Sequence, residues 1–142
     1  MPVYLLDVNV LIALTWPSHV HHARARQWWS TIDEWATTPL TEAAFLRLCL
    51  NRSVVGRAVS LVEARSMLAA VRAAPGHRFL ADDTSLAEAA VDLVRVATSG
   101  QITDAHLVNL AAHHGAVLAT MDAGIPNMLA ESDTQHVELV RT

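Results

Sequence analysis

The sequence contains no lysine, and all ten of its basic residues are arginine. This absence excludes reactions that need a lysine, including Schiff-base chemistry and the phosphate-binding lysine of a P-loop. With a formal net charge of −4, the chain also lacks the positive charge by which many proteins bind nucleic acid non-specifically. The charge is still compatible with an enzyme that acts on nucleic acid through an acidic site filled by cations.

Cysteine occurs once, at Cys49, so no disulfide can form within the chain and the reducing cytoplasm is the expected compartment. Long hydrophobic runs are also missing. The longest strictly apolar runs, such as residues 10–14, are five residues, whereas a membrane span needs about 20. No basic segment precedes the first apolar stretch, so we expect neither a signal peptide nor a membrane segment.

The length and composition indicate one folded domain over residues 1–142. A chain of 142 residues is close to the size of one average domain and can bury about two-thirds of its unfolded surface. Hydrophobic residues make up 52% of the chain and charged residues 17%, which excludes disorder along the whole length.

Apolar runs, prolines, glycines and helix-capping residues predict an alternation of strands and helices. Ser18, Thr41 and Thr103 are the predicted caps of three of the helices. The predicted strands are residues 3–6, 35–38, 77–80, 116–120 and 136–140. The predicted helices are residues 8–14, 19–32, 42–50, 61–73, 85–97, 103–114 and 126–130. This order predicts an α/β fold with a central, mostly parallel sheet of four to five strands, flanked by helices.

Four acidic residues follow the predicted strands or open the next helix: Asp7, Glu42, Asp104 and Asp122. Ligands of such folds bind outside the carboxyl ends of the strands, so we expect these side chains to lie together. Clustered carboxylates repel one another unless cations lie between them. Mg²⁺ is the expected ion, with Mn²⁺ as a substitute, and such a site suits phosphodiester hydrolysis.

Acidic residues also occur near helix N-termini for a simpler reason, because they cap the helix and interact with its dipole. This interpretation explains the position of Glu42 and that of Asp104, each considered on its own. It does not account for Asp7, which lies between Leu6 and Val8 in an apolar stretch where a charge is costly without a partner. Asp7 therefore favours a functional site.

Three motifs resemble those of PIN-domain ribonucleases. The first is Leu5-Leu6-Asp7-Val8-Asn9, and the second is Thr38-Pro39-Leu40-Thr41-Glu42. The third begins at Thr103-Asp104-Ala105-His106-Leu107 and continues to Leu118-Ala119-Thr120-Met121-Asp122. Their order and their coverage of the chain are similar to those of VapC, the toxin of type II VapBC toxin–antitoxin modules.

The resemblance implies a metal-dependent endoribonuclease with Asp7, Glu42, Asp104 and Asp122 as its acids. Asp7, Asp104 and Asp122 would be the direct metal ligands, with Glu42 as a possible further one. Asn9 and Thr120 match positions that orient the acids. Many relatives have a basic residue and a phenylalanine after the last acid, where this chain has Ala123-Gly124-Ile125.

The resemblance further implies an RNA substrate, a VapB-type antitoxin and a homodimer. Transfer RNA or another structured RNA, cut in a single-stranded loop, is the expected substrate class. The predicted helix over residues 19–32 is apolar on more than one face, and its adjacent Trp28 and Trp29 diverge by about 100°. We therefore expect one of them to meet a partner, in an antitoxin groove that includes Trp16, Val20, Trp28 and Trp29.

Other readings are less well supported. A histidine cluster, His19, His21 and His22, suggests zinc but lacks the second half of a zinc motif. Capping of the following helix by Asp83 or Thr84 accounts for the acidic pair Asp82 and Asp83. Haloacid-dehalogenase phosphatases and response-regulator receivers both need a lysine, which the chain lacks. A catalytically inactive PIN-like binding module remains the alternative, and the complete set of acids argues against it.

Overall fold

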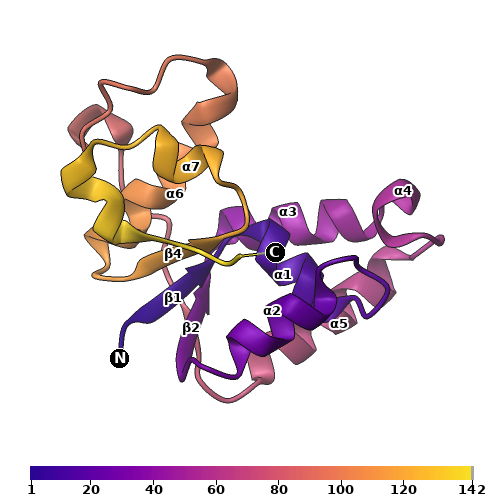
Figure 1. Cartoon of the computed structure of the whole chain (residues 1–142). Helices are drawn as coiled ribbons and strands as arrows, with labels where there is room; N and C mark the ends of the chain where they lie inside the picture. Colours follow the sequence, from indigo (N-terminus) through magenta and orange to yellow (C-terminus); the bar gives the residue numbers. More distant parts are fainter. Residues whose placement is uncertain (142) are drawn as a thin grey trace.

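The computed structural model describes residues 1–141 and contains one five-stranded sheet, in the order β3-β2-β1-β4-β5 (Figure 1). All four strand pairs are parallel, which confirms the predicted α/β class. The strands are β1 (Val3–Leu6), β2 (Glu34–Thr37), β3 (His77–Phe79), β4 (Val117–Thr120) and β5 (Val137–Leu139). Each lies within one residue of its predicted start.

Side chains that alternate along the strands fill two separate cores, one on each face of the sheet. Tyr4 and Leu6 of β1 belong to one core, while Leu5 between them belongs to the other. Trp35 and Ala36 of β2 divide between the two cores in the same way. Burial on both faces explains why these strands are short apolar runs without polar alternation.

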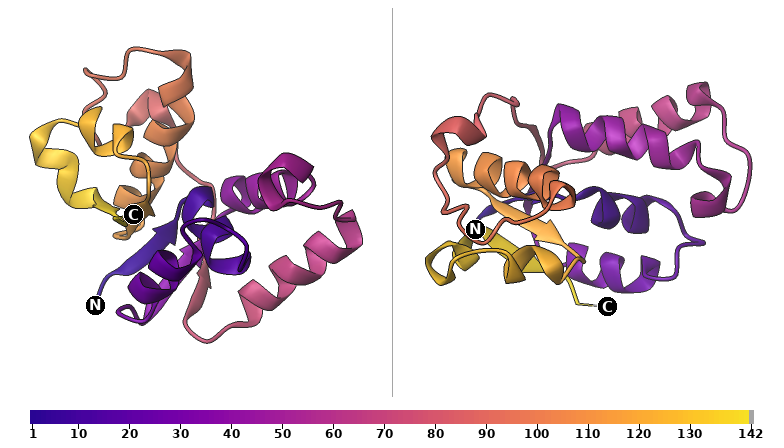
Figure 2. Two further views of the ribbon diagram at one scale, coloured as in Figure 1. Left: turned by 45° about the vertical axis from the view of Figure 1, so that its right-hand side comes forward. Right: turned by 90° about the horizontal axis from the view of Figure 1, so that it is seen from above.

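The helices divide between the two faces according to their place in the chain. Residues 1–141 contain seven α-helices: α1 (Val8–Thr15), α2 (His22–Trp29), α3 (Pro39–Cys49), α4 (Arg52–Val55), α5 (Leu61–Ala73), α6 (Ile102–His113) and α7 (Gly124–Asn127). Figures 1 and 2 show α1 to α5 gathered on one side of the sheet and α6 and α7 on the other. The chain crosses between the sides after β3, so β1 and β4 flank the point where the strand order reverses.

The predicted helix over residues 85–97 is wrong. The structure has only a short 3₁₀ turn there, η1 (Leu86–Glu88), and irregular chain as far as a second turn, η2 (Ser99–Gln101). Two buried side chains hold this segment by its backbone. Asn109 accepts a hydrogen bond from the Ala90 amide (2.7 Å), and Asp133 accepts one from the Asp92 amide (2.8 Å). These contacts occupy amide groups that a helix would use internally.

Three predicted helix starts are also wrong. α2 begins at His22, after turns at residues 17–21, and not after Ser18. α3 begins at Pro39, whose missing N–H suits the first helical position, and the hydroxyl of Thr41 accepts a hydrogen bond from the Thr38 amide (3.1 Å). α6 begins at Ile102, directly after η2, so Thr103 lies inside it.

The other short elements complete the connections. α4 was not predicted, and η3 (Glu131–His136) precedes β5. Among the described residues, none of the helices combines the length and the apolar character that a membrane span requires.

Gly76 provides a test of the turn that leads into β3. Its φ is +90°, and an added Cβ would overlap the carbonyl oxygen of Asp33. Gly115 has a φ of +66° but no atom within 4 Å of its Cβ position. Both Gly→Ala variants should lose about 1–2 kcal/mol of unfolding free energy to backbone strain, and Gly76→Ala should lose about 1–3 kcal/mol more to the overlap.

Urea unfolding of the two variants measures this difference directly. Equal losses for Gly76→Ala and Gly115→Ala would contradict the close approach of the two backbones.

Candidate active site

Asp7 is a buried carboxylate at the carboxyl end of the central strand. It follows β1 directly, precedes α1 and is 6% exposed. Its Oδ1 accepts a hydrogen bond from the Val8 amide (2.8 Å), and its Oδ2 accepts one from the Thr120 hydroxyl (2.7 Å). Burial raises the pKa of Asp7 above its ordinary value, and these two hydrogen bonds oppose that rise.

Asn9 and Thr120 join Asp7 to the end of β4. Leu6 pairs with Ala119 in the sheet register, which places Thr120 beside Asp7. The Asn9 amide group donates to Asp7 Oδ2 and to Thr120 Oγ1 (both 3.3 Å), and Asn9 Oδ1 accepts from the Met121 amide (3.1 Å). The carboxylate is therefore held in a fixed orientation by donors from two elements.

Asp122 lies two residues beyond β4 and is exposed. Its amide donates to Thr120 Oγ1 (3.1 Å), and its Oδ1 accepts from the Gly124 amide (2.8 Å). A Cβ at Gly124 would lie 3.0 Å from this oxygen. Glycine at this position thus leaves room around the carboxylate.

Asp104 lies in the first turn of α6 and comes close to the other two aspartates. Its pKa is raised to about 6, first by burial and then by the charges of Asp7 and Asp122. Among the described residues, no arginine or histidine forms an ion pair with any of these three carboxylates. The uncompensated negative charge fits a cation site made of oxygen ligands.

The three carboxylates are near one another but do not form a closed cage. In residues 1–141, they are not among the groups whose ligand atoms all lie within 4.8 Å. Ligand oxygens on opposite sides of Mg²⁺ lie only about 4.2 Å apart, so direct binding of one ion by all three carboxylates requires at least one side chain to move inward.

Glu42 has partners of its own in this structure. Its Oε2 accepts a hydrogen bond from the Thr37 hydroxyl (2.7 Å) and forms an ion pair with Arg72 of α5 (2.7 Å). The side chain of Glu42 is 15% exposed. The structure thus brings together three of the four predicted acids and gives the fourth a cationic partner.

Asp83 or Thr84 was predicted to cap the helix that follows the Asp82–Asp83 pair, and this prediction is wrong. Asp82 Oδ1 lies 2.7 Å from His106 Nε2, and Asp83 Oδ1 lies 2.9 Å from His114 Nε2. Both acids contact histidines of α6 or its C-cap. Ser85 caps η1 in their place, by accepting a hydrogen bond from the Ala87 amide.

The His19, His21 and His22 cluster makes local contacts. His19 Nδ1 accepts a hydrogen bond from the His21 amide (3.0 Å), and His22 Nδ1 lies 2.7 Å from the Ala13 carbonyl oxygen. In the described part of the chain these three residues do not form a metal-binding group.

The expectation that only one of Trp28 and Trp29 faces the core is wrong. Trp28 packs edge-on against Tyr4 and donates to Glu138 (2.6 Å), while Trp29 packs edge-on against Trp35. Both contact the same core. Trp16 is 6% exposed, whereas Val20 is 85% exposed, so Val20 is the predicted partner residue that is most open to a partner.

Sequence reasoning missed Arg72, Thr37 and Gly124 as neighbours of the acids. The Asp122-x-Gly124 spacing, typical of a turn closed by an aspartate side chain, could have indicated the Gly124 contact. Nothing in the local sequence links Arg72 to Glu42, because the two residues are 30 positions apart.

Comparisons with known proteins identify the family of this chain. The model of the family described as PIN domain matches residues 4–128. Ribonuclease VapC38 of Mycobacterium tuberculosis is 47% identical over 138 residues, which cover 96% of each chain. Ribonuclease VapC39 of the same species is 46% identical over 124 residues, which cover 85% of this chain and 89% of that protein.

Two solved structures share the fold. PAE2754 from Pyrobaculum aerophilum superposes with a TM-score of 0.59 at 25% identity, over 90% of this chain and 80% of the other. Mycobacterium tuberculosis VapC20, described as a toxin that cleaves the sarcin–ricin loop, gives a TM-score of 0.59 at 14% identity, over 90% and 97% of the two chains. The chain therefore belongs to the PIN-domain family and, within it, to the VapC ribonuclease toxins of toxin–antitoxin modules.

Proposed function

We propose that this VapC-type ribonuclease is an Mg²⁺-dependent endoribonuclease whose metal ligands are Asp7, Asp104 and Asp122. The observation that carries the proposal is the grouping of three carboxylates with which, among the described residues, no arginine or histidine pairs. Burial, and then the charges of Asp7 and Asp122, raise the pKa of Asp104 to about 6. Oxygen ligands suit Mg²⁺, and Mn²⁺ can take its place. The arrangement argues against an inactive PIN-like binding module, because the repulsion between the three carboxylates would destabilise such a module without serving a function.

The protein groups have distinct roles in this site. A divalent cation held there supplies an activated water and stabilises the charge that develops on the phosphate. Thr120 and Asn9 fix the Asp7 carboxylate from one side. The Gly124 amide orients Asp122 at the exposed edge, where a phosphate can approach. The partly buried Asp104 completes the ligand set from the start of α6.

Glu42 can act as a metal ligand only if its carboxylate leaves Arg72. Its Oε2 atom holds both Arg72 and Thr37, so a role as a further metal ligand requires release from the arginine. We propose that Glu42 stays with Arg72 until RNA phosphate, which pairs well with a guanidinium group, competes for Arg72.

The proposed substrate is a structured RNA such as transfer RNA, cut in a single-stranded loop. Bases in such a loop are unstacked and accessible, unlike those in the deep groove of an RNA helix. Cleavage of this RNA in the cytoplasm would stop translation and growth.

The first functional prediction concerns the products. Purified protein with Mg²⁺ should cleave transfer RNA to fragments with a 5′-phosphate and a 3′-hydroxyl, because water and not the 2′-hydroxyl attacks. EDTA should abolish cleavage, and added Mn²⁺ should restore it. Products with a 2′,3′-cyclic phosphate, or full activity in EDTA, would contradict the mechanism. No activity on any RNA with Mg²⁺ would favour the inactive binding module.

The second prediction separates catalysis from stability. Asp104→Asn should lower the cleavage rate by about 100-fold or more, whereas Asp33→Asn, an exposed acid at the opposite end of the sheet, should not. Without metal at pH 7.5, Asp104→Asn should melt at a higher temperature than the parent, because it relieves repulsion.

The pH dependence of this difference follows from the sign of the shift. The folded chain binds the Asp104 proton more tightly than the unfolded chain, since the pKa is raised from 3.8 to about 6. The contribution of Asp104 to the unfolding free energy of the parent protein is fully present below pH 4, and it is lost as the pH rises through 6. The two melting temperatures should therefore converge near pH 4 in calorimetry. A lower melting temperature for Asp104→Asn at pH 7.5 would show that Asp104 is structural.

We also propose that a VapB-type antitoxin packs over α2 and the preceding turn, and that the toxin forms a homodimer. Trp16 directly precedes this turn and is buried, and the exposed Val20 lies on the turn. A basic side chain of the antitoxin, preferably arginine, would reach the acidic site, because carboxylates pair strongly with a guanidinium group.

The matched variants Val20→Glu and Val94→Glu test this surface, since the two valines are 85% and 81% exposed. Val20→Glu should weaken antitoxin binding by about tenfold or more, and Val94→Glu should leave it unchanged. Calorimetric titration gives the affinities, and light scattering gives the oligomeric mass. Equal affinities for both variants would remove Val20 from the interface.

A further inference from the structure

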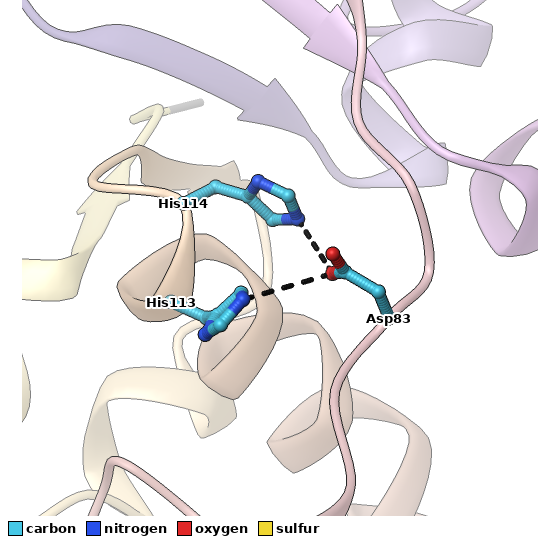
Figure 3. Close-up of side chains that lie close together, drawn as sticks. All are labelled: Asp83, His113 and His114. Atoms are coloured by element: carbon cyan, nitrogen blue, oxygen red, sulfur yellow. Dashed lines mark hydrogen bonds and ion pairs between the residues drawn. The ribbon is translucent and has the colours of Figure 1, made fainter.

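A second group of potential metal ligands lies at the other end of α6 (Figure 3). His113 and His114 end the helix, and Asp83 comes from the irregular segment after β3. His114 Nε2 lies 2.9 Å and His113 Nε2 lies 3.9 Å from Asp83 Oδ1. Figure 3 shows both rings directed at the same carboxylate. Ligand atoms of all three residues lie within 4.8 Å of one another.

These separations match a tetrahedral ion. Zinc binds imidazole nitrogen and carboxylate oxygen at about 2.0–2.2 Å, which places tetrahedral ligand atoms about 3.3–3.5 Å apart. The separations of His114 Nε2 and His113 Nε2 from Asp83 Oδ1, 2.9 Å and 3.9 Å, lie on either side of this value. We propose that His113, His114 and Asp83 bind one Zn²⁺ ion.

The chemistry of the ligands selects zinc over the ion of the acidic site. Two imidazoles with one carboxylate suit Zn²⁺, whereas Mg²⁺ prefers oxygen ligands alone. The C-terminal end of α6 carries partial negative charge, which favours a cation. His113 and Asp83 also line an open cavity of about 250 Å³ together with Glu88 and Asn109, so water or the Glu88 carboxylate has room to complete the coordination.

Binding requires one rearrangement of a proton. His114 Nε2 lies 3.0 Å from the Ala81 carbonyl oxygen as well as near Asp83, so without metal it is placed to carry a hydrogen and donate it. To bind zinc through Nε2, the neutral ring carries its proton on Nδ1 instead. The contact of His114 with Ala81 is then lost, and the metal replaces it.

The zinc site is separate from the site of RNA cleavage. Asp104 and His113 are nine residues apart on α6, which corresponds to about 14 Å along the helix. Zinc at Asp83 would instead clamp the irregular segment that follows β3 onto α6. The proposal does not depend on the proposed function, and each can fail without the other.

The test is equilibrium dialysis of the full chain with ZnCl₂, in excess Mg²⁺ that saturates the acidic site. We expect one Zn²⁺ per chain in the parent, and affinity about tenfold or more weaker in both His113→Ala and Asp83→Asn. The His113 side chain is 52% exposed and contacts Asp83 and the edge of the His114 ring, so His113→Ala should fold normally. Matched controls are His21→Ala in the other histidine cluster and Asp104→Asn in the acidic site, and both should bind zinc as the parent does.

Co²⁺ gives an independent readout, because tetrahedral Co²⁺ absorbs visible light. The parent and both control variants should show this absorption, and His113→Ala should lose it. Unchanged zinc binding in His113→Ala and Asp83→Asn would overturn the proposal. So would loss of the bound zinc in either control.

Discussion

The hydrogen bond from Thr120 to Asp7 is the interaction on which the site depends. It joins the ends of the two strands that flank the reversal of strand order, at the place where parallel sheets bind ligands. Asp7 is 6% exposed there, and a buried charge is tolerated only with partners. The donors that hold Asp7 also set the backbone of the segment leading to Asp122, because the Asp122 amide bonds to the same hydroxyl.

This arrangement stabilises one carboxylate and leaves two others without compensation. Asp104 and Asp122 lie near Asp7, on α6 and beyond β4, and no arginine or histidine of residues 1–141 forms an ion pair with either of them. Glu42, by contrast, has Arg72. The protein thus balances the charge of Glu42 itself, whereas the charges of Asp104 and Asp122 are left for a ligand to balance. A fold optimised only for stability would have paired Asp104 as well.

The strands and the positions of the acids were predictable because local signals determine them. A buried parallel strand is a short apolar run, and an acidic residue directly after it lies at the edge of the sheet formed by the carboxyl ends of the strands. The irregular segment after β3 was not predictable, because Asn109 and Asp133 hold it from distant positions. The Glu42–Arg72 pair and the shared core of Trp28 and Trp29 likewise arise from tertiary packing. The motif after Asp122 was read as a departure from the family, yet the Gly124 amide bonds to that acid.

The central claim is that Asp7, Asp104 and Asp122 hold a divalent cation while Glu42 stays with Arg72 in the absence of RNA. A crystal structure of the RNA-free protein grown with Mn²⁺, with anomalous diffraction to locate the metal, tests this claim most directly. The account predicts an anomalous peak within bonding distance of carboxylate oxygens of the three aspartates. A crystal with Mn²⁺ bound only elsewhere, or bound by Glu42 without Asp104, would contradict it.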